Sequence, residues 1–237
     1  MHDHNGLTEN IAANLSLIRR NIENAARRSG RDPVDITLVA VTKTVGTDAI
    51  RAAISCGVKV VGESRVQEAM EKLRLVGPAV EWHLIGHLQK NKVKYILDSF
   101  SLVHSVDSYE LAAEIGRQAA QKGKTMPVLL QVNIGEEKSK HGVAPLDAAD
   151  TAKRVAGLDG IRLCGLMAIP PFADDPESSR PYFRRVLEIK CGLEGLRLEK
   201  GTFDVLSFGM TGDYEVAVEE GATHLRIGTG IFGERQN

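Results

Sequence analysis

The stretch TLVAVTKTVG, residues 37–46, decides the fold. Its apolar run predicts a buried strand over residues 36–42, and the run ends directly at Lys43. A threonine and a glycine then break the pattern, so Lys43 is expected at the carboxyl end of this strand. A lysine at a strand end is most often a solvated surface residue. The rest of the chain decides whether that ordinary interpretation applies here.

Seven further apolar runs follow, with helix-like stretches between them. The further strand candidates cover residues 58–62, 82–86, 101–106, 127–134, 161–169, 204–208 and 224–232. The helix-like stretches include residues 47–55, 65–75, 108–122, 146–157 and 181–196. Strands that alternate with helices are typical of parallel βαβ units. From residue 36 onward the chain provides roughly 25 residues per unit, at the short end of what a (β/α)8 barrel needs.

The N-terminal segment is expected to form one additional helix over residues 11–29. Apolar residues recur there at spacings of four, three and four, the period of one helix face: Ile11, Leu15, Ile18 and Ile22. The expected fold class is therefore α/β, a single (β/α)8 TIM barrel over residues 1–237 with an extra N-terminal helix. A doubly wound open sheet is the competing fold, although no GxGxxG motif follows the first strand.

Composition argues against several classes of protein. The chain has 237 residues, 43% of them hydrophobic, with 30 basic and 31 acidic side chains and a formal charge of −1. This balance gives no support for a nucleic-acid or membrane-surface partner. The cysteines are widely spaced and form no CxxC pair, so we expect thiols in a reducing compartment: Cys56, Cys164 and Cys191. No apolar run approaches the roughly 20 residues of a membrane span, and the polar N-terminus lacks a signal-peptide core, so we expect a cytoplasmic protein.

Lys43 is the first candidate site residue. In a (β/α)8 barrel the active site lies at the carboxyl ends of the strands, where Lys43 is expected. Apolar barrel walls disfavour the charged form of a lysine and leave its amine available as a nucleophile. Such an amine suits Schiff-base formation with a carbonyl compound.

The last two strands supply a candidate anion site. The sequence GMTGD ends a strand at Met210 and places Thr211 at the expected start of a helix, and RIGTG adds Gly228 and Thr229 after the eighth strand. Backbone N–H groups at a helix start and threonine hydroxyls suit a phosphate. The loops after strands 7 and 8 are also the frequent phosphate site of this fold. The alternatives are an ordinary N-cap for Thr211 and a simple turn for Gly228 and Thr229.

Arg226 is the third candidate. Alternation along the last strand puts His224, Arg226 and Gly228 on one face. An arginine inside a barrel is costly unless its hydrogen bonds are accepted, which suggests an interior ligand. The alternative is a salt bridge to an acidic residue at the rim.

The segment WHLIGHLQKNK invites a zinc interpretation, because His83 and His87 are four residues apart. On a helix that spacing would align them, but this segment is expected to be a strand, where they lie about 13 Å apart. No glutamate between them makes an HExxH motif. We therefore expect no metal bound by this pair, and we expect residues 89–92 to begin the next helix.

Two ligand classes remain on the residues alone. One is a sugar phosphate, with Lys43 as the Schiff-base lysine of an aldolase. The other is pyridoxal 5′-phosphate (PLP), an aldehyde that carries a phosphate. Arg226 favours PLP, since the pyridine nitrogen of PLP is met by an aspartate or an arginine in proteins.

Seven ordered segments resemble the pyridoxal phosphate homeostasis protein family, which shares the barrel domain of bacterial alanine racemase. They are AVTKT, GESRVQE, WHLIGHLQKNKVK, HSVDS, QVNIGEEKSKHG, GLMAIP and LSFGMTGDYEVAVEEGATHLRIGTGIFG. The resemblance extends from about residue 10 to residue 235. It implies a barrel that holds PLP as an internal aldimine on Lys43.

The resemblance also implies roles for the other candidates. Thr211, Gly228 and Thr229 would hold the phosphate, and Arg226 would face the pyridine nitrogen. Further expected cofactor contacts are Met210, Ser64, His83 and Asn133. The chain departs from the family pattern at three positions: Ser64 replaces a usual asparagine, Thr42 a common serine, and Thr211 a usual serine.

The implied function is PLP (vitamin B6) homeostasis, as a carrier or buffer, without an established catalytic turnover. An arginine at the pyridine nitrogen keeps it unprotonated, which makes the ring a poor electron sink. A racemase also needs a second acid/base group, a role that a tyrosine fills in alanine racemase. The tyrosines of this chain fall on expected helices or helix starts: Tyr95, Tyr109, Tyr182 and Tyr214. Only Tyr214 is expected near the site. The first alternative is a racemase-like fold-type III PLP enzyme acting on amino acids, and a Schiff-base aldolase is a distant second. Expected partners are PLP, amino acids and PLP-requiring apoenzymes; a monomer is expected, and residues 135–145 could be a lid or a partner surface.

Overall fold

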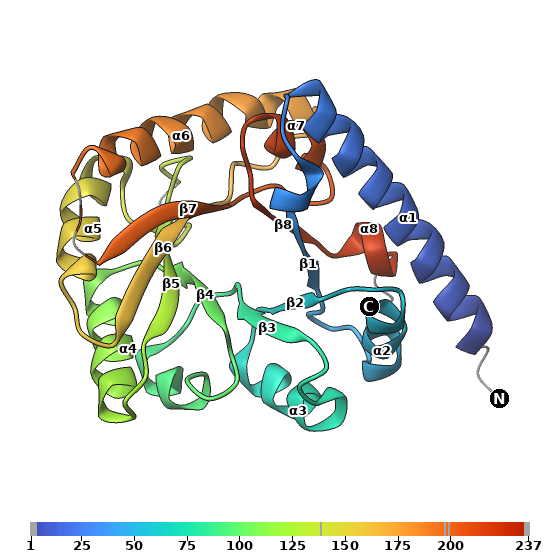
Figure 1. Ribbon diagram of the computed structural model, residues 1–237, viewed down its shortest axis with the longest axis horizontal. Coiled ribbons are helices and arrows are strands. Elements are labelled where there is room, and N and C mark those ends of the chain that lie inside the picture. Colours follow the sequence, from blue (N-terminus) through green and yellow to red (C-terminus); the bar gives the residue numbers. More distant parts are fainter. Residues whose placement is uncertain (1–3, 138, 197, 199, 235–237) are drawn as a thin grey trace.

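The sheet is a closed barrel of eight parallel strands that follow one another around it in sequence order (Figure 1). The computed structural model describes residues 4–137, 139–196, 198 and 200–234. The strands are β1 (Thr37–Val41), β2 (Val60–Glu63), β3 (Glu81–Leu84), β4 (Leu102–Val106), β5 (Met126–Val132), β6 (Ile161–Ala168), β7 (Gly201–Ser207) and β8 (His224–Ile227). The expected (β/α)8 barrel is thus confirmed, and the competing open sheet is wrong.

The barrel closes where β1 pairs with β8. In this parallel pair Val39 lies opposite Arg226, and Ala40 lies opposite Ile227. The first and last strands of the chain are therefore neighbours, and so are the loops at their carboxyl ends. Strands such as β2 and β4 are buried along their whole length, as expected for a parallel sheet covered on both faces.

Helices surround the barrel. They are α1 (His4–Arg28), α2 (Thr47–Ser55), α3 (Val66–Val76), α4 (Tyr109–Gln121), α5 (Ala148–Ala156), α6 (Arg180–Glu194), α7 (Tyr214–Glu219) and α8 (Thr229–Phe232). Four short 3₁₀ turns complete the described elements: η1 (Pro33–Asp35), η2 (Lys90–Tyr95), η3 (Pro145–Asp147) and η4 (Pro176–Ser179). No helix in the described ranges combines the length and the apolar character needed to cross a membrane.

Most expected boundaries differ from the structure by a few residues, and three differences concern the extent or type of an element. The last strand was expected over residues 224–232, but it ends at Ile227, because a glycine at 228 turns the chain and α8 follows. The helix expected after the third strand is the 3₁₀ turn η2. The N-terminal helix was expected over residues 11–29; it begins at His4 and ends at Arg28.

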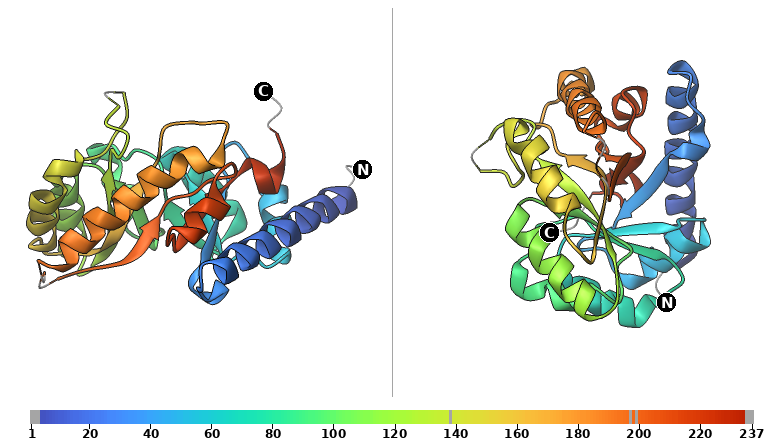
Figure 2. Two further views of the ribbon diagram at one scale, coloured as in Figure 1. Left: turned by 90° about the horizontal axis from the view of Figure 1, so that it is seen from above. Right: turned by 60° about the vertical axis from the view of Figure 1, so that its left-hand side comes forward.

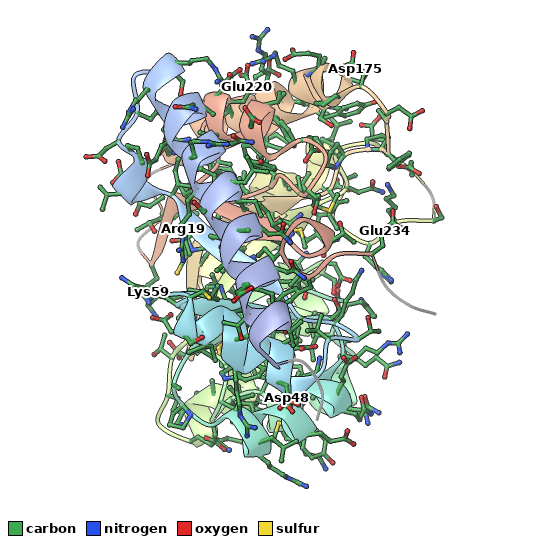
Figure 3. The ribbon with its side chains drawn as sticks, turned by 90° about the vertical axis from the view of Figure 1, so that its right-hand side faces the viewer. Arg19, Asp48, Lys59, Asp175, Glu220 and Glu234 are labelled. Carbon is green, nitrogen blue, oxygen red and sulfur yellow. The ribbon has the colours of Figure 1, made fainter. Side chains whose placement is uncertain are left out.

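The extra N-terminal helix is an integral part of the packing. In Figure 3, α1 crosses one side of the molecule, with Arg19 near its middle, and Figure 2 shows the same helix beside α7 and α8. Ile11, Leu15, Ile18 and Ile22, the residues of the expected apolar face, are all buried. Arg19 Nη1 also donates a hydrogen bond to the carbonyl of Cys56, at 3.0 Å. The helix therefore covers the seam at which the first and last units of the barrel meet.

Truncation of this apolar face tests that role. We expect Leu15→Ala, at a fully buried position, to lower the free energy of unfolding by about 2–5 kcal/mol, through lost burial and the cavity left behind. Leu17, on the same helix, is 47% exposed, so Leu17→Ala serves as the matched control with an effect within about 0.5 kcal/mol. Urea unfolding followed by circular dichroism measures both, and equal effects would show that α1 is not packed as described.

Candidate functional site

A cavity of about 540 Å³ opens at the carboxyl ends of the strands. Of the site residues expected from the sequence, it is lined by Lys43, Ser64, Met210, Thr211, Arg226, Gly228 and Thr229. A larger hollow of about 710 Å³ lies at the opposite end of the barrel. It is lined by residues that begin strands, such as Thr37, Val60 and Glu81. Since the amine, the hydroxyls and the guanidinium all face the smaller one, we take the Lys43 cavity as the candidate site.

Lys43 is the second residue after β1, and a buried ion pair holds Thr42, the residue before it. Thr42 Oγ1 donates a hydrogen bond of 2.6 Å to Glu63 Oε1. Lys72 Nζ, from α3, donates to the same oxygen at 2.8 Å and to the Thr42 carbonyl at 2.5 Å. Glu63 and Lys72 are both buried, so this network fixes the backbone on the β1 side of Lys43.

The residue after Lys43 is also anchored to α3. Thr44 has a φ of 61°, a left-handed conformation that costs a non-glycine residue on the order of 1 kcal/mol. Its backbone N–H donates to Glu68 Oε1 at 2.6 Å, and the same oxygen accepts from Lys72 at 2.6 Å. Both neighbours of Lys43 are thus held by one helix, which limits the movement of the Lys43 backbone.

The charge of Glu63 is set by opposing effects. Burial raises the pKa of its carboxyl, while hydrogen bonds from Lys72 and Thr42 act to lower it, and the net change is upward. Its second oxygen, Oε2, is buried and has no hydrogen-bond partner within the residues that the structure describes. Sequence reasoning missed this carboxylate, although GESRVQE places it at the end of the second strand candidate.

The two threonine hydroxyls expected to bind an anion meet in the cavity. Thr229 Oγ1 donates to Thr211 Oγ1 at 3.1 Å, and the backbone N–H of Gly230 donates to the same oxygen at 3.2 Å. Because a hydroxyl has one hydrogen and two acceptor positions, Thr211 keeps its own hydrogen for a further acceptor. The loops after β7 and β8 therefore present donors to one place.

The loop that carries Thr211 differs from the expectation. The helix does not start at Thr211 but at Tyr214, and its N-cap is Asp213. The carboxylate of Asp213 accepts from the backbone N–H of Met210 at 2.7 Å and from Ser179 Oγ at 2.9 Å. Thr211 is therefore neither the first residue of the helix nor its N-cap, and it sits in a turn that Asp213 closes.

Arg226 is buried inside the barrel and lines the cavity. Its Nη1 donates to the carbonyl and the hydroxyl of Ser207, both at 2.7 Å, and its Nη2 donates to the carbonyl of Ala168 at 3.0 Å. The alternative of a salt bridge at the rim is wrong for the described residues, since none of their carboxylates pairs with this guanidinium. Burial lowers the pKa of Arg226 to about 10, so it stays charged at neutral pH.

Comparison with known proteins shows the family of this chain. The model for the alanine racemase N-terminal domain matches residues 13–236. A pyridoxal phosphate homeostasis protein of Aquifex aeolicus is 41% identical over 96% of this chain and 99% of its own length. The protein of that name from Escherichia coli K12 is 40% identical, over 95% and 97%. The chain belongs to the pyridoxal phosphate homeostasis protein family.

One solved structure that this chain resembles contains bound PLP. The structure of PipY from Synechococcus elongatus, with PLP bound, superposes on this chain with a TM-score of 0.82 and 32% sequence identity. The superposition covers 94% of this chain and 100% of that one. The homeostasis-family resemblance noted in the seven sequence segments is therefore confirmed across nearly the whole chain.

Two expected contacts of the family do not line the Lys43 cavity. His83 lines the hollow at the other end of the barrel instead. Asn133 lies on a neighbouring cavity and braces the loop after β5, where its Nδ2 donates to the carbonyls of Glu137 and Lys140 at 2.9 and 3.3 Å. Lys140 itself borders both cavities, and sequence reasoning missed it because nothing local ties that loop to the first strand.

His83 belongs to a buried polar network that continues from Arg226 into the barrel. Ser207 Oγ, which accepts from Arg226, lies 2.8 Å from His104 Nδ1. His104 Nε2 in turn lies 3.0 Å from His83 Nδ1, and the ring of His224 stacks on that of His83 with 5.9 Å between centroids. Burial lowers the pKa of His83 to about 3 and that of His224 to about 4, and it holds the pKa of His104 well below its usual value.

These histidines should make stability depend on pH. Their folded-state pKa values lie below the ordinary 6.5, so the unfolded chain binds more protons once the pH falls below that value. The contribution of His83 and His224 is therefore complete above pH 6.5 and is lost as the pH falls, by roughly 2 kcal/mol for each of the two between pH 7 and pH 5.

Urea unfolding of the parent and of His224→Asn at both pH values isolates this effect. The variant lacks one titrating group, so its loss between pH 7 and pH 5 should be smaller by roughly 2 kcal/mol. The raised pKa of Glu63 acts with the opposite sign but is common to both proteins and cancels in the difference. An equal loss in parent and variant would contradict the assignment of His224 as a buried neutral residue.

Proposed function

We propose that this chain binds PLP in the Lys43 cavity and acts in vitamin B6 homeostasis as a carrier or buffer of the cofactor. One observation carries the proposal: Lys43, the Thr211–Thr229 hydroxyl pair and Arg226 line a single cavity. An amine, a cluster of hydroxyl and backbone donors, and a guanidinium match an aldehyde, a phosphate and a ring nitrogen. The names of the Aquifex and Escherichia relatives and the PLP in PipY support the same assignment.

The phosphate end of the cavity fits the group in its donor set. Thr211 keeps a hydroxyl hydrogen after accepting from Thr229 and Gly230. Gly228 lies beside the end of β1, where a Cβ would be in ordinary van der Waals contact with Val41 at 3.4 Å. Hydroxyl and backbone N–H donors can bind a phosphate dianion without a cationic side chain. Lys43 is therefore not needed to bind the phosphate. We assign Thr211, Gly228 and Thr229 to the phosphate.

The Arg226 end fits an acceptor nitrogen. The described residues accept three of the five guanidinium N–H groups, so two remain for a ligand in the cavity. A guanidinium with a pKa of about 10 donates a hydrogen bond at neutral pH but does not give up its proton. PLP supplies an aldehyde and an electron-withdrawing ring. The ring withdraws electrons less strongly when its nitrogen is unprotonated. Arg226 therefore orients the cofactor and disfavours carbanion chemistry.

The surroundings of the cavity favour a carrier over an amino-acid racemase. None of the four tyrosines lines the cavity. The Tyr214 hydroxyl, the candidate nearest in sequence, accepts a hydrogen bond from Asn21 of α1 at 2.9 Å. Phe172 and Met210 at the mouth are 91% and 37% exposed, so solvent reaches the rim. We propose PLP-requiring apoenzymes as recipients and a monomer as the acting form.

Covalent trapping tests the proposal. PLP is added to the purified protein, the mixture is reduced with borohydride, and the modified peptide is mapped by mass spectrometry. We expect a phosphopyridoxyl group on Lys43 in the parent and in Lys153→Ala, an exposed control lysine on α5. We expect at least a tenfold loss of label in Lys43→Ala. Label spread over other lysines, or none at all, would contradict the assignment of Lys43.

The family model for the racemase domain keeps a slow amino-acid enzyme as the second candidate. Arg226→Glu separates the two, since an acidic partner would let the ring nitrogen hold a proton and strengthen the ring as an electron sink. We expect no racemisation of amino acids by the parent or by Arg226→Glu, with Arg226→Gln as a control for loss of the guanidinium. Racemisation that rises in Arg226→Glu would establish the enzyme instead, and cleavage of a sugar phosphate would contradict both PLP proposals. Circular dichroism first verifies that each variant is folded.

A further inference from the structure

Three potential metal ligands meet at the mouth of the barrel, outside the Lys43 cavity. His87 follows β3, Asp107 follows β4, and His141 lies in the loop after β5. His87 Nδ1 is 2.9 Å from Asp107 Oδ2, and His141 Nδ1 is 3.5 Å from the same oxygen. One ligand atom from each residue lies within 4.8 Å of the other two.

These separations suit a single bound ion. Two ligands that are each about 2.1 Å from one metal lie about 3.0 Å apart at a right angle and about 3.4 Å apart at the tetrahedral angle. The two nitrogen–oxygen distances of 2.9 and 3.5 Å are close to these values. The two imidazole rings are also stacked, with centroids 3.9 Å apart and planes 11° from parallel. The Nδ1 atoms of both rings lie near one carboxylate oxygen. Because the lone pair of an imidazole nitrogen lies in the plane of its ring, the exposed His141 ring must turn out of this stack for both Nδ1 atoms to bind one ion.

Neighbouring groups hold the ligands in place. Asp107 Oδ1 accepts from Ser108 Oγ at 3.3 Å, which leaves Oδ2 directed at the histidines. The carbonyl of His141 accepts from Gln131 Nε2 at 2.9 Å. Gly142, with a φ of 128°, lets the chain pass so close to Asn133 that a Cβ there would lie 2.5 Å from its backbone nitrogen. The contact to Asp107 is of the outer kind that orients metal ligands. The other two contacts fix the backbone that carries His141.

We propose that His87, Asp107 and His141 form a binding site for a divalent transition-metal ion. Two imidazoles and one carboxylate suit Zn²⁺, Ni²⁺, Co²⁺ or Cu²⁺ and not the oxygen-binding Mg²⁺ or Ca²⁺. The Asp107 side chain is only 12% exposed, whereas His87 and His141 are 42% and 57% exposed, so an ion can reach the site from solvent. A cavity of about 300 Å³ that His87 and His141 help to line adjoins the site.

An ion at this position would link three loops. It would fix the His141 loop to the ends of β3 and β4, and so restrain Lys140, the residue before His141. Lys140 lines the Lys43 cavity as well as the cavity beside the proposed metal site. Metal binding would therefore steady one wall of the Lys43 cavity. The proposed site does not depend on what that cavity binds.

Co²⁺ titration of the full chain tests the site. The parent for this experiment carries His2→Ala and His4→Ala, which removes two other histidines at the N-terminus as potential ligands. We expect one Co²⁺ per chain by isothermal titration calorimetry, with visible d–d bands and no thiolate charge-transfer band from the cysteines. Binding should also raise the melting temperature, because the ion binds the folded state.

Matched variants identify the ligands. Asp107→Asn and His141→Gln should each weaken Co²⁺ binding at least tenfold and abolish the shift in melting temperature. Asp98→Asn makes the same change at an exposed aspartate elsewhere on the surface and should leave Co²⁺ affinity unchanged. Both ligand variants alter partly exposed side chains, and their melting temperatures without metal establish that they fold. No binding by the parent, or equal binding by the parent and both ligand variants, would overturn the proposal.

Discussion

The pairing of β1 with β8 is the constraint on which the rest of the structure depends. These strands come from opposite ends of the chain, and their register sets Val39 beside Arg226. Closure therefore brings the Lys43 turn to the loop of Gly228 and Thr229. An open sheet would leave these groups at its two edges, and no single cavity could contain them. The N-terminal helix α1 packs against α2, α7 and α8, and so covers the seam that closure creates.

Closure also buries the charged side chain of Arg226, and polar groups inside the barrel stabilise it. Arg226 is buried and charged, and a buried charge is tolerated only when hydrogen bonds replace the lost water. Ser207 and the carbonyl of Ala168 supply part of that replacement. Ser207 is in turn in contact with His104, so neutral histidines line the interior beyond the arginine. The barrel thus holds a cation in its core, and two of its guanidinium N–H groups have no acceptor among the described residues.

Around the rim, side chains from several loops are organised by the helices and turns that follow the strands. The Glu63–Lys72 pair and Glu68 tie both neighbours of Lys43 to α3. Asp213 closes the turn that carries Thr211. On the other side of the mouth, the loops after β3, β4 and β5 bring two histidines and an aspartate together. Strand ends in a closed barrel meet at one rim, so each loop adds chemistry there without changing the barrel.

The sequence by itself determined the barrel, because alternation of apolar runs and amphipathic stretches is a local property that tertiary contacts did not override. It also determined Lys43, Thr211, Arg226 and Thr229 as one group, since each lies at or near the end of the first or the last two strands. Only the tertiary structure decided the side-chain contacts. His83 faces the opposite hollow, because its depth along β3 and its contact with His104 set its position. Likewise, the Glu63–Lys72 pair forms only once α3 packs against the end of β2. The cluster of His87, Asp107 and His141 joins three separate loops, and its distances exist only once the barrel has closed.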